Sequence, residues 1–244
     1  MNACPIEICV ETFEAALAAE RGGASRIELC ARLDLNGLTP EEDLTAAVVR
    51  VLSIPVRVLI RPHDRGFVYT PDEFREMRQQ VQRVKEAGAA GVVLGVLLAD
   101  GRVDVGRSRE LVELARPMKV TFHRAFDKTP DLTEALEAVI ATGADCLLTS
   151  GGAAEVLSGA EAIARLRSQA GTRIQPMAGG GLRLPNLVEV LRRTGVNWLH
   201  GSLSRREGAG ASAADKAERL EADVREAVRL MQGELRRRCQ TRMT

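Results

Sequence analysis

Eight short apolar runs, each followed by a segment of helix-forming residues, constrain the fold of this chain more than any other feature. The runs alternate apolar with other side chains, as strands do, and most lead into charged, hydroxyl-bearing or glycine residues. They lie at residues 6–10, 27–30, 56–61, 91–97, 119–124, 146–150, 174–179 and 198–202. Eight strands alternating with helices in 244 residues predict a closed parallel (β/α)8 barrel, or TIM barrel, whose usual size is about 250 residues.

The segments between these runs favour the same fold. Turns of similar sequence precede the even-numbered strands, which fits a barrel assembled from two-strand modules. These turns are Gly23-Ala24-Ser25, Gly88-Ala89-Ala90, Gly143-Ala144-Asp145 and Gly195-Val196-Asn197. A doubly wound open sheet also alternates strands and helices, and turn preferences alone can produce the repeat, so both stay as alternatives. We expect a single domain over residues 1–244 with a C-terminal helical extension: a small-residue loop at 206–214, then a closing helix and basic tail at 215–238.

The composition limits the partners of the protein. With 34 Lys+Arg against 33 Asp+Glu the net charge is +1, so no overall field draws it to nucleic acid or to an anionic membrane. Aromatic residues make up 3% of the chain, which argues against base-stacking surfaces. No segment approaches about 18 uncharged apolar residues, and the five cysteines are scattered without a Cys-x-x-Cys motif. We expect a cytoplasmic protein with reduced thiols that binds a small molecule or a metal, and neither nucleic acid nor membrane.

Polar side chains within the strands indicate where a functional site lies. One parity of a barrel strand faces the helices and must be apolar, so charged residues of the other parity point to the interior or its mouth. We expect them to converge at the carboxyl ends of the strands, where TIM barrels carry their sites. The candidate catalytic residues are Glu7, Glu28, Arg61, His123, Arg124 and His200. A structural plug of mutually neutralising charges is the alternative.

Glycines follow the last three strands, in the region where barrels often bind phosphate through backbone N–H groups. The candidate anion-binding residues are Ser150, Gly151, Gly152, Gly179, Gly180, Gly181, Gly201 and Ser202. Tight turns between strand and helix are the alternative explanation for these glycines.

Several reaction classes lack their residues in this chain. The lysines, which fall at 85, 119, 128 and 216, do not end a predicted strand, so we do not expect a Schiff-base aldolase. Nucleotide-binding, zinc-protease and serine-esterase motifs are absent from the sequence. Acid–base or metal-assisted chemistry of the lyase or isomerase kind remains, or metal binding alone.

Cys9 and Cys30 end neighbouring strands with the same parity, so their sulfurs can approach closely. Thiolates favour the soft ion Cu(I), and the pair could hold one such ion. The alternative is that both are small buried apolar side chains. Glu7 and Glu28, if ionised, would raise the thiol pKa and oppose thiolate formation, so we expect modest Cu(I) binding that folding does not require.

Seven strings of residues, in order along the chain, match the pattern of a known family. They are Ile6-Glu7-Ile8-Cys9-Val10, Glu20-Arg21-Gly22-Gly23-Ala24 continuing to Arg26-Ile27-Glu28-Leu29-Cys30, Gly37-Leu38-Thr39-Pro40, Ile60-Arg61-Pro62, Phe67-Val68-Tyr69, Thr121-Phe122-His123-Arg124-Ala125-Phe126-Asp127 and Thr149-Ser150-Gly151-Gly152. Through these strings the chain, from about residue 6 to 202, resembles the CutC family, named for copper homeostasis.

The resemblance to the CutC family implies a cytoplasmic TIM barrel, a homodimer or higher homo-oligomer, and Cu(I) ligands at Cys9 and Cys30. The chain departs from the family pattern at His63-Asp64-Arg65-Gly66, at Ala178, where proline is usual, and at Gly201. These positions surround the expected mouth of the barrel, so the choice of ligand can differ from that of the family.

Three functions therefore stay open. The family resemblance favours a Cu(I)-binding protein of copper homeostasis. The residues themselves favour an enzyme that acts on a small oxygenated or phosphorylated molecule. In that hypothesis His123 or Glu28 is the base, Arg61 and Arg124 hold an anion, and His200 is the acid. The polar plug would leave a non-catalytic scaffold.

Overall fold

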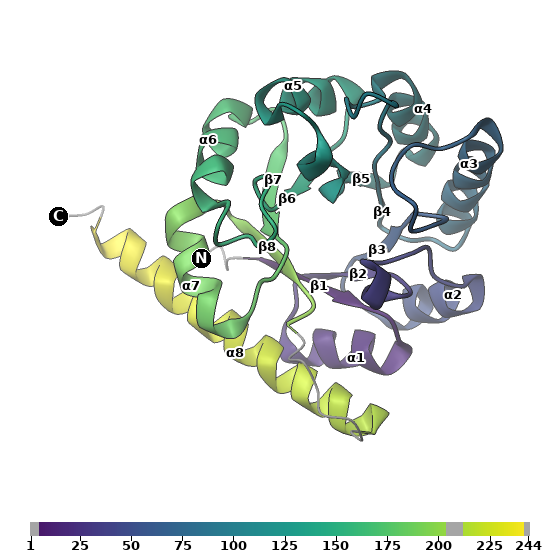
Figure 1. Ribbon diagram of the computed structural model, residues 1–244. Helices are drawn as coiled ribbons and strands as arrows, with labels where there is room; N and C mark the ends of the chain where they lie inside the picture. The colour runs from purple at the N-terminus through teal and green to yellow at the C-terminus, as the bar shows by residue number, and fades with distance from the viewer. Residues whose placement is uncertain (1–4, 204–211, 242–244) are drawn as a thin grey trace.

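The strands close into a parallel barrel in which each pairs with its neighbour in sequence and β8 pairs with β1 (Figure 1). The predicted (β/α)8 barrel is therefore confirmed. This computed structural model describes residues 5–203 and 212–241, without the side chains of 238–241. The strands are β1 Ile6–Val10, β2 Arg26–Leu29, β3 Val56–Leu59, β4 Gly91–Leu94, β5 Lys119–Phe122, β6 Cys146–Thr149, β7 Gln175–Gly179 and β8 Trp198–Gly201.

Helices form a ring around the barrel (Figure 1). They are α1 Phe13–Gly22, α2 Glu42–Val51, α3 Pro71–Glu86, α4 Val105–Ala115, α5 Leu132–Thr142, α6 Ala160–Ala170, α7 Leu184–Thr194 and α8 Ala213–Thr241, with 3-10 turns η1 Leu33–Leu35 and η2 Arg124–Lys128. Their ends follow local signals. Helix α1 starts after Thr12, whose side chain accepts the Ala15 N–H, and stops before Gly23, whose φ of 94° suits glycine. Helix α3 starts with a capping box of Thr70 and Glu73.

Most strands end one to three residues earlier than the sequence pattern predicts. The difference matters most after β5, where the chain leaves the sheet at Phe122 and enters η2. The cause is local: the His123 side chain caps η2 by accepting the Ala125 N–H. Arg124 therefore belongs to a helical turn and not to a strand.

The long helix α8 lies across the outside of the barrel, against α1 and α7 (Figure 1). A Cβ atom on Gly22 would lie 2.7 Å from Cβ of Val224, so α1 and α8 cross in near backbone contact. Arg21 donates a hydrogen bond to Glu221 across the same crossing at 2.7 Å. Within residues 5–203 and 212–241, no helix is long and apolar enough to span a membrane.

Some predicted features lie outside the described residues. Residues 206–211 of the predicted small-residue loop belong to this group, as do Cys4, the side chain of Cys239 and the end of the basic tail. The closing helix predicted from residue 215 lies within α8.

Strand parity divides each strand between two environments. The outward residues, such as Ile6 and Ile8 on β1 or Ile27 and Leu29 on β2, are fully buried in the apolar layer between strands and helices. The inward residues of the same strands are largely polar. On the side of β1 and β2 the barrel interior is therefore charged, while Leu59 and Val93 form an apolar cluster with Cys9 and Cys30.

Candidate functional site

An ion-paired group of side chains lies low in the barrel interior. Glu7, fully buried on β1, accepts hydrogen bonds from Arg26 of β2 and from Nδ1 of His200 of β8, the second at 2.8 Å. The Arg26 guanidinium also lies 3.8 Å from the centre of the Trp198 ring. Each buried charge therefore has a partner, which offsets the cost of removing it from water. We call Arg26, Glu7 and His200 the ion-pair column.

The ion-pair column sets the charges of its members. Burial alone would raise the pKa of Glu7, but the charge of Arg26 and the hydrogen bond from His200 lower it to about 2. Burial alone would lower the pKa of His200, but the charge of Glu28 and the contact with Glu7 outweigh burial and raise it. Glu7 lies beneath the cavity described below and is not part of its wall. We therefore place Glu7 as a positioning residue that acts through His200.

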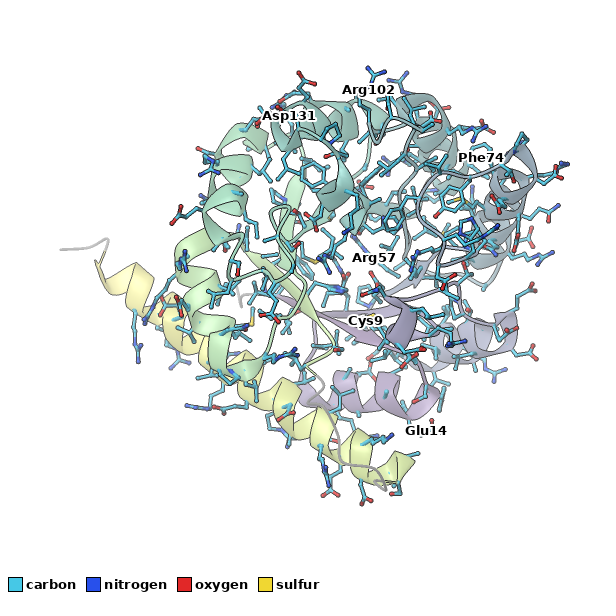
Figure 2. The ribbon with its side chains drawn as sticks, in the orientation of Figure 1. Cys9, Glu14, Arg57, Phe74, Arg102 and Asp131 are labelled. Atoms are coloured by element: carbon cyan, nitrogen blue, oxygen red, sulfur yellow. The ribbon has the colours of Figure 1, made fainter. Side chains whose placement is uncertain are left out.

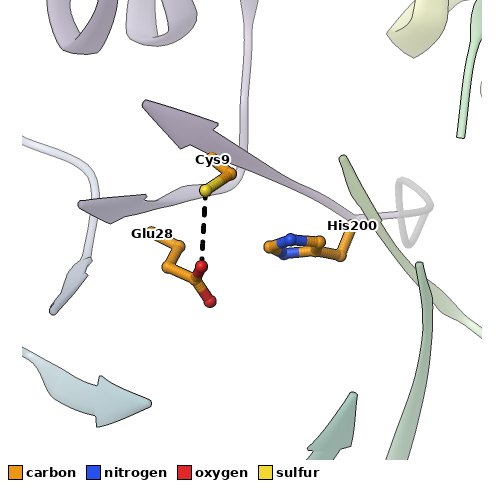
Figure 3. A group of neighbouring side chains, drawn as sticks. All are labelled: Cys9, Glu28 and His200. Atoms are coloured by element: carbon orange, nitrogen blue, oxygen red, sulfur yellow. Dashed lines mark hydrogen bonds between the residues drawn. The ribbon is translucent and has the colours of Figure 1, made fainter. Parts of the chain in front are cut away.

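Two thiols lie above the ion-pair column. The Sγ atoms of Cys9 and Cys30 are 3.3 Å apart, as the shared parity of their strands predicts. The Cys9 thiol donates to Oε1 of Glu28 at 3.3 Å (Figure 3). One ligand atom from each of Cys9, Glu28 and His200 lies within 4.8 Å of the others. Cys9 contributes to the cavity floor, whereas Cys30 is fully buried behind it.

The surroundings of the thiols favour their protonated form. The hydrogen bond between Cys9 and Cys30, followed by burial and by the charges of Cys30 and Glu28, raises the pKa of the Cys9 thiol well above its usual range. Burial also raises the pKa of Glu28. Within the described part of the chain, Oε2 of Glu28 has no hydrogen-bond partner. This carboxyl group on the cavity floor therefore has an oxygen that a ligand can contact.

A cavity of about 750 Å3 extends from Cys9, Glu28 and His200 to the loops at the carboxyl ends of the strands. Its size suits a small organic molecule. Among the described residues that line it, the carboxylates are Glu28 and Asp64. The cations in its wall are Arg61, Arg65, Arg124, Lys128 and Arg183. Arg65 and Arg124 are paired with Glu73 and Asp127, and the remaining excess of positive charge in this concave site favours an anion.

His123 lies in the cavity wall with its ring held from two sides. Nδ1 accepts the Ala125 N–H at 3.2 Å, and the ring centre lies 5.0 Å from that of Phe67. A Cβ atom at Gly95 would lie 2.6 Å from Nδ1, so only glycine leaves room for the imidazole. Burial and the charge of Arg61 lower the pKa of His123 to about 3. The imidazole is therefore neutral at physiological pH, and its Nδ1 is engaged by the Ala125 N–H.

Asp127 fills the loop where the sequence predicts part of an anion site. Its carboxylate accepts N–H groups from Ser150 and Gly152, at 2.9 and 3.0 Å, and the hydroxyl of Thr149 at 2.5 Å. It also accepts Nε of Arg124 at 3.0 Å. The side chain of Asp127 is only 3% exposed. The N–H groups after β6 therefore already hold an anion, and it is one supplied by the chain itself.

The predicted glycine residues divide into two groups. Ser150, Gly151 and Gly152 lie outside the cavity wall, and the Gly151 N–H is taken by Thr149. The cavity wall does include four of the predicted anion-binding residues: Gly180, Gly181, Gly201 and Ser202. Gly179 ends β7 below them, and a Cβ atom there would lie 3.0 Å from the His200 ring.

Several residues that build this site were not identified from sequence. Arg57 points into the barrel from β3 and donates to Thr121 (Figure 2). Parity could have identified it, because Arg57 lies between the outward residues Val56 and Val58. Arg26 precedes the apolar run at 27–30 that marks β2 in the sequence, so the pattern does not point to it. Lys128 and Arg183 follow strands at a distance, and no periodic pattern points to them.

Comparison with known proteins agrees with the resemblance seen in the sequence. The model of the CutC family matches residues 4–205. A protein of Vibrio cholerae named family protein CutC is 45% identical over 197 residues, which are 80% of this chain and 78% of that protein. A protein of the same name from Chromobacterium violaceum is 42% identical over 227 residues, or 88% of this chain and 92% of that one.

Solved structures give the same result for the fold. A crystal structure from Streptococcus agalactiae, named CutC with a proposed role in copper homeostasis, has a TM-score of 0.78 and 28% identity. It covers 82% of this chain, and the match covers 99% of that one. The thiamine phosphate pyrophosphorylase of Pyrococcus furiosus has a TM-score of 0.62 at 17% identity, covering 96% of this chain and 98% of that one. At that identity the likeness concerns the barrel alone.

Proposed function

This chain belongs to the CutC family, and we propose that it binds Cu(I) as cargo through Cys9 and Cys30. The observation that carries the proposal is the distance of 3.3 Å between the two sulfurs, in a compartment that also contains Glu28 and His200. Thiolates are the protein ligands that Cu(I) prefers, and imidazole is a common further ligand for copper. The role in copper homeostasis is taken from the name of the family.

The donor set fits Cu(I) in its chemistry. Cys9 and Cys30 supply soft sulfur atoms, and when bound there the ion would neutralise the negative charge of the thiolates it creates. Glu28 and His200 lie close enough to Cys9 to complete a coordination shell. The raised pKa of Cys9 opposes the binding, because a proton must leave before the sulfur can act as a ligand. We therefore propose a site of modest affinity from which the cargo can be released.

The location and assembly of the protein are part of the same proposal. Cys9, Cys30 and Cys146 are free thiols, and the family of this chain is named for copper homeostasis; both support a reducing compartment such as the cytoplasm. A homo-oligomer is proposed on the family resemblance alone, and gel filtration with light scattering would measure it.

Competition with a chromogenic Cu(I) chelator tests the copper site. We expect the anaerobic wild-type protein to take one Cu(I) from the chelator and Cys9→Ser/Cys30→Ser to take none. Cys146→Ser is the matched control. Cys146 is also a buried thiol on a barrel strand, but it lies beside Gln175 of β7 in the sheet, near the end of the barrel opposite the site. Equal affinity in wild type and double variant would refute the proposal.

The same titration at several pH values adds a second readout. Affinity should rise with pH, by up to roughly tenfold per unit for each proton that the ion displaces. The double variant should keep its far-UV circular dichroism, because the apolar strands and helices supply the core without metal. Loss of the fold on removal of copper would contradict a cargo role and would indicate a structural metal.

A further inference from the structure

The cavity above the thiols contains two buried donors that nothing in the described chain satisfies. They are Nε2 of His123 and Nε of Arg61, and both residues are 6% exposed. A buried polar group without a partner destabilises the fold, so two such donors in a cavity wall point to a ligand. The Arg61 guanidinium is otherwise fixed, because Nη1 donates to the carbonyls of Leu35 and Gly37 at 2.9 and 2.7 Å.

The hydrogen bonds of His123 define what it offers to that ligand. Nδ1 accepts the Ala125 N–H, so it carries no proton itself. A neutral imidazole has one N–H, which must then be on Nε2. The pKa near 3 keeps the ring neutral at physiological pH. His123 is therefore a fixed, uncharged donor, which suits the uncharged oxygen of a carbonyl or hydroxyl group better than a carboxylate.

The cations of the cavity wall lie on other loops. Arg65 is paired with Glu73, but Arg124, Lys128 and Arg183 come from η2 and from the turn between β7 and α7. Arg124 is held by Asp127 and by the Ser150 hydroxyl, at 3.0 and 2.9 Å, so its position is set before any ligand binds.

The backbone beside Arg124 also suits an anion. A Cβ atom at Gly180 would lie 2.8 Å from Cζ of Arg124, so the guanidinium packs directly against the backbone of this turn. Helix α7 starts at Leu184, directly after the turn, and its N-terminus adds positive potential. Asp127 balances the charge of Arg124, so Arg183 at this turn and Lys128 in the same cavity wall supply the charge that matches a dianion such as phosphate.

We propose that this cavity binds a small organic phosphate, with the phosphate among Arg124, Lys128 and the 180–183 turn and an uncharged oxygen of the same molecule on Nε2 of His123. The site shares its floor with the thiols but does not depend on copper. It keeps the part of the predicted anion site at Gly180 and Gly181 and leaves out the loop at 150–152, whose N–H groups Asp127 already accepts.

Titration calorimetry with two phosphonates tests both halves of the site. Phosphonoacetone carries a carbonyl and propylphosphonate does not, while their dianionic groups are alike. We expect both to bind at millimolar concentration or below, and phosphonoacetone to bind three- to tenfold more tightly, the size of one neutral hydrogen bond. Arg124→Gln should weaken both ligands by roughly ten- to a hundredfold. Lys119→Gln, which removes the same charge from the first residue of β5 at the opposite end of the barrel, should change neither.

Variants of His123 distinguish the contribution of its Nε2 donor to binding from that of its aromatic ring. In His123→Phe, which keeps an aromatic ring beside Phe67, the preference for phosphonoacetone should disappear while propylphosphonate still binds. His123→Gln should restore part of the preference, because its amide can donate from a similar position. Cys30→Ser should lose Cu(I) and keep phosphonate binding, since Cys30 is not in the cavity wall. Failure of the copper proposal and failure of this one are therefore distinguishable.

Ring nitrogen NMR gives an independent readout on the wild-type protein, whose three histidines can each be resolved. We expect His123 to show the Nε2–H neutral form at pH 7 and its Nε2 signal to shift with phosphonoacetone. The proposal is overturned by a charged or Nδ1–H His123 at pH 7. It is equally overturned if neither phosphonate binds at millimolar concentration, or if Arg124→Gln binds both as tightly as wild type.

Discussion

Asp127→Asn should destabilise the protein strongly, because Asp127 serves as an internal anion for two loops. One carboxylate oxygen accepts the Thr149 hydroxyl and the Gly152 N–H, and the other accepts Nε of Arg124 and both donors of Ser150. Asparagine keeps the shape of the side chain but turns one of these oxygens into a donor. Whichever way the amide faces, an N–H group that was paired loses its acceptor and Arg124 loses its counter-charge.

The magnitude follows from these losses. A buried donor left without an acceptor costs about 1–3 kcal/mol, and a charge-assisted hydrogen bond contributes about 1.5–3 kcal/mol. Taking the lower half of each range, we expect Asp127→Asn to lower the free energy of unfolding by about 3 kcal/mol. Water cannot compensate, since the Asp127 side chain is 3% exposed.

Equilibrium unfolding in urea measures this loss, and Asp145→Asn is the matched control. Asp145 also accepts several donors, among them Arg116 at 2.7 Å and the Val120 N–H at 2.9 Å, but its side chain is 20% exposed. Water can therefore replace its partners, and we expect a loss of about 1 kcal/mol. The reasoning fails if Asp127→Asn costs no more than Asp145→Asn, or if phosphonate binding survives the loss of the Arg124 anchor.

Two further predictions concern titration and helix packing. Because the folded-state pKa of His123 is about 3 and its ordinary value is 6.5, the neutral ring stabilises the fold above pH 6.5, and this contribution falls as the pH drops towards 3. Between pH 6.5 and 5 the wild type should lose about 2 kcal/mol relative to His123→Phe in urea unfolding; parallel curves would contradict the buried neutral ring. Gly22→Ala should cost about 1–3 kcal/mol, since its Cβ would collide with Val224, whereas Gly233→Ala in α8 meets nothing within 4 Å and should stabilise by up to about 1 kcal/mol. Thermal unfolding of both variants checks this pair, and a stabilising Gly22→Ala would mean that α1 and α8 are less closely packed than described.

Strand parity predicted which side chains of each strand face the barrel interior. It did not predict how far along the barrel axis each of them lies. Glu7 and Glu28 both face the interior, as their apolar neighbours required, because alternation is a property of the extended backbone. Depth depends on the tilt and stagger of the closed barrel, which a single strand does not reveal. Glu7 is consequently sealed beneath the cavity with Arg26, while Glu28 forms part of its floor.

The partners of loop residues could not be predicted from sequence either. The string from Ser150 to Gly152 has the composition of an anion-binding turn, and it does bind an anion. That anion is Asp127, 25 residues before Gly152, and only the three-dimensional structure brings the two together. The same holds for His123, since its role depends on the Ala125 N–H and on the absence of a side chain at Gly95.

The crossing of α8 over α1 has a consequence for folding during synthesis on the ribosome. The hydrogen bond between Arg21 and Glu221 joins residues separated by 200 positions. Strand β1 likewise cannot complete its pairing in the sheet until β8 has been synthesised. At roughly 5–20 residues per second, the outer face of α1 remains without its covering helix for about 10–40 s after it is made. When β1 and α1 leave the ribosome, β1 therefore has one unpaired edge and the outer face of α1 is uncovered. Its packing is complete only after β8 and α8 have been synthesised.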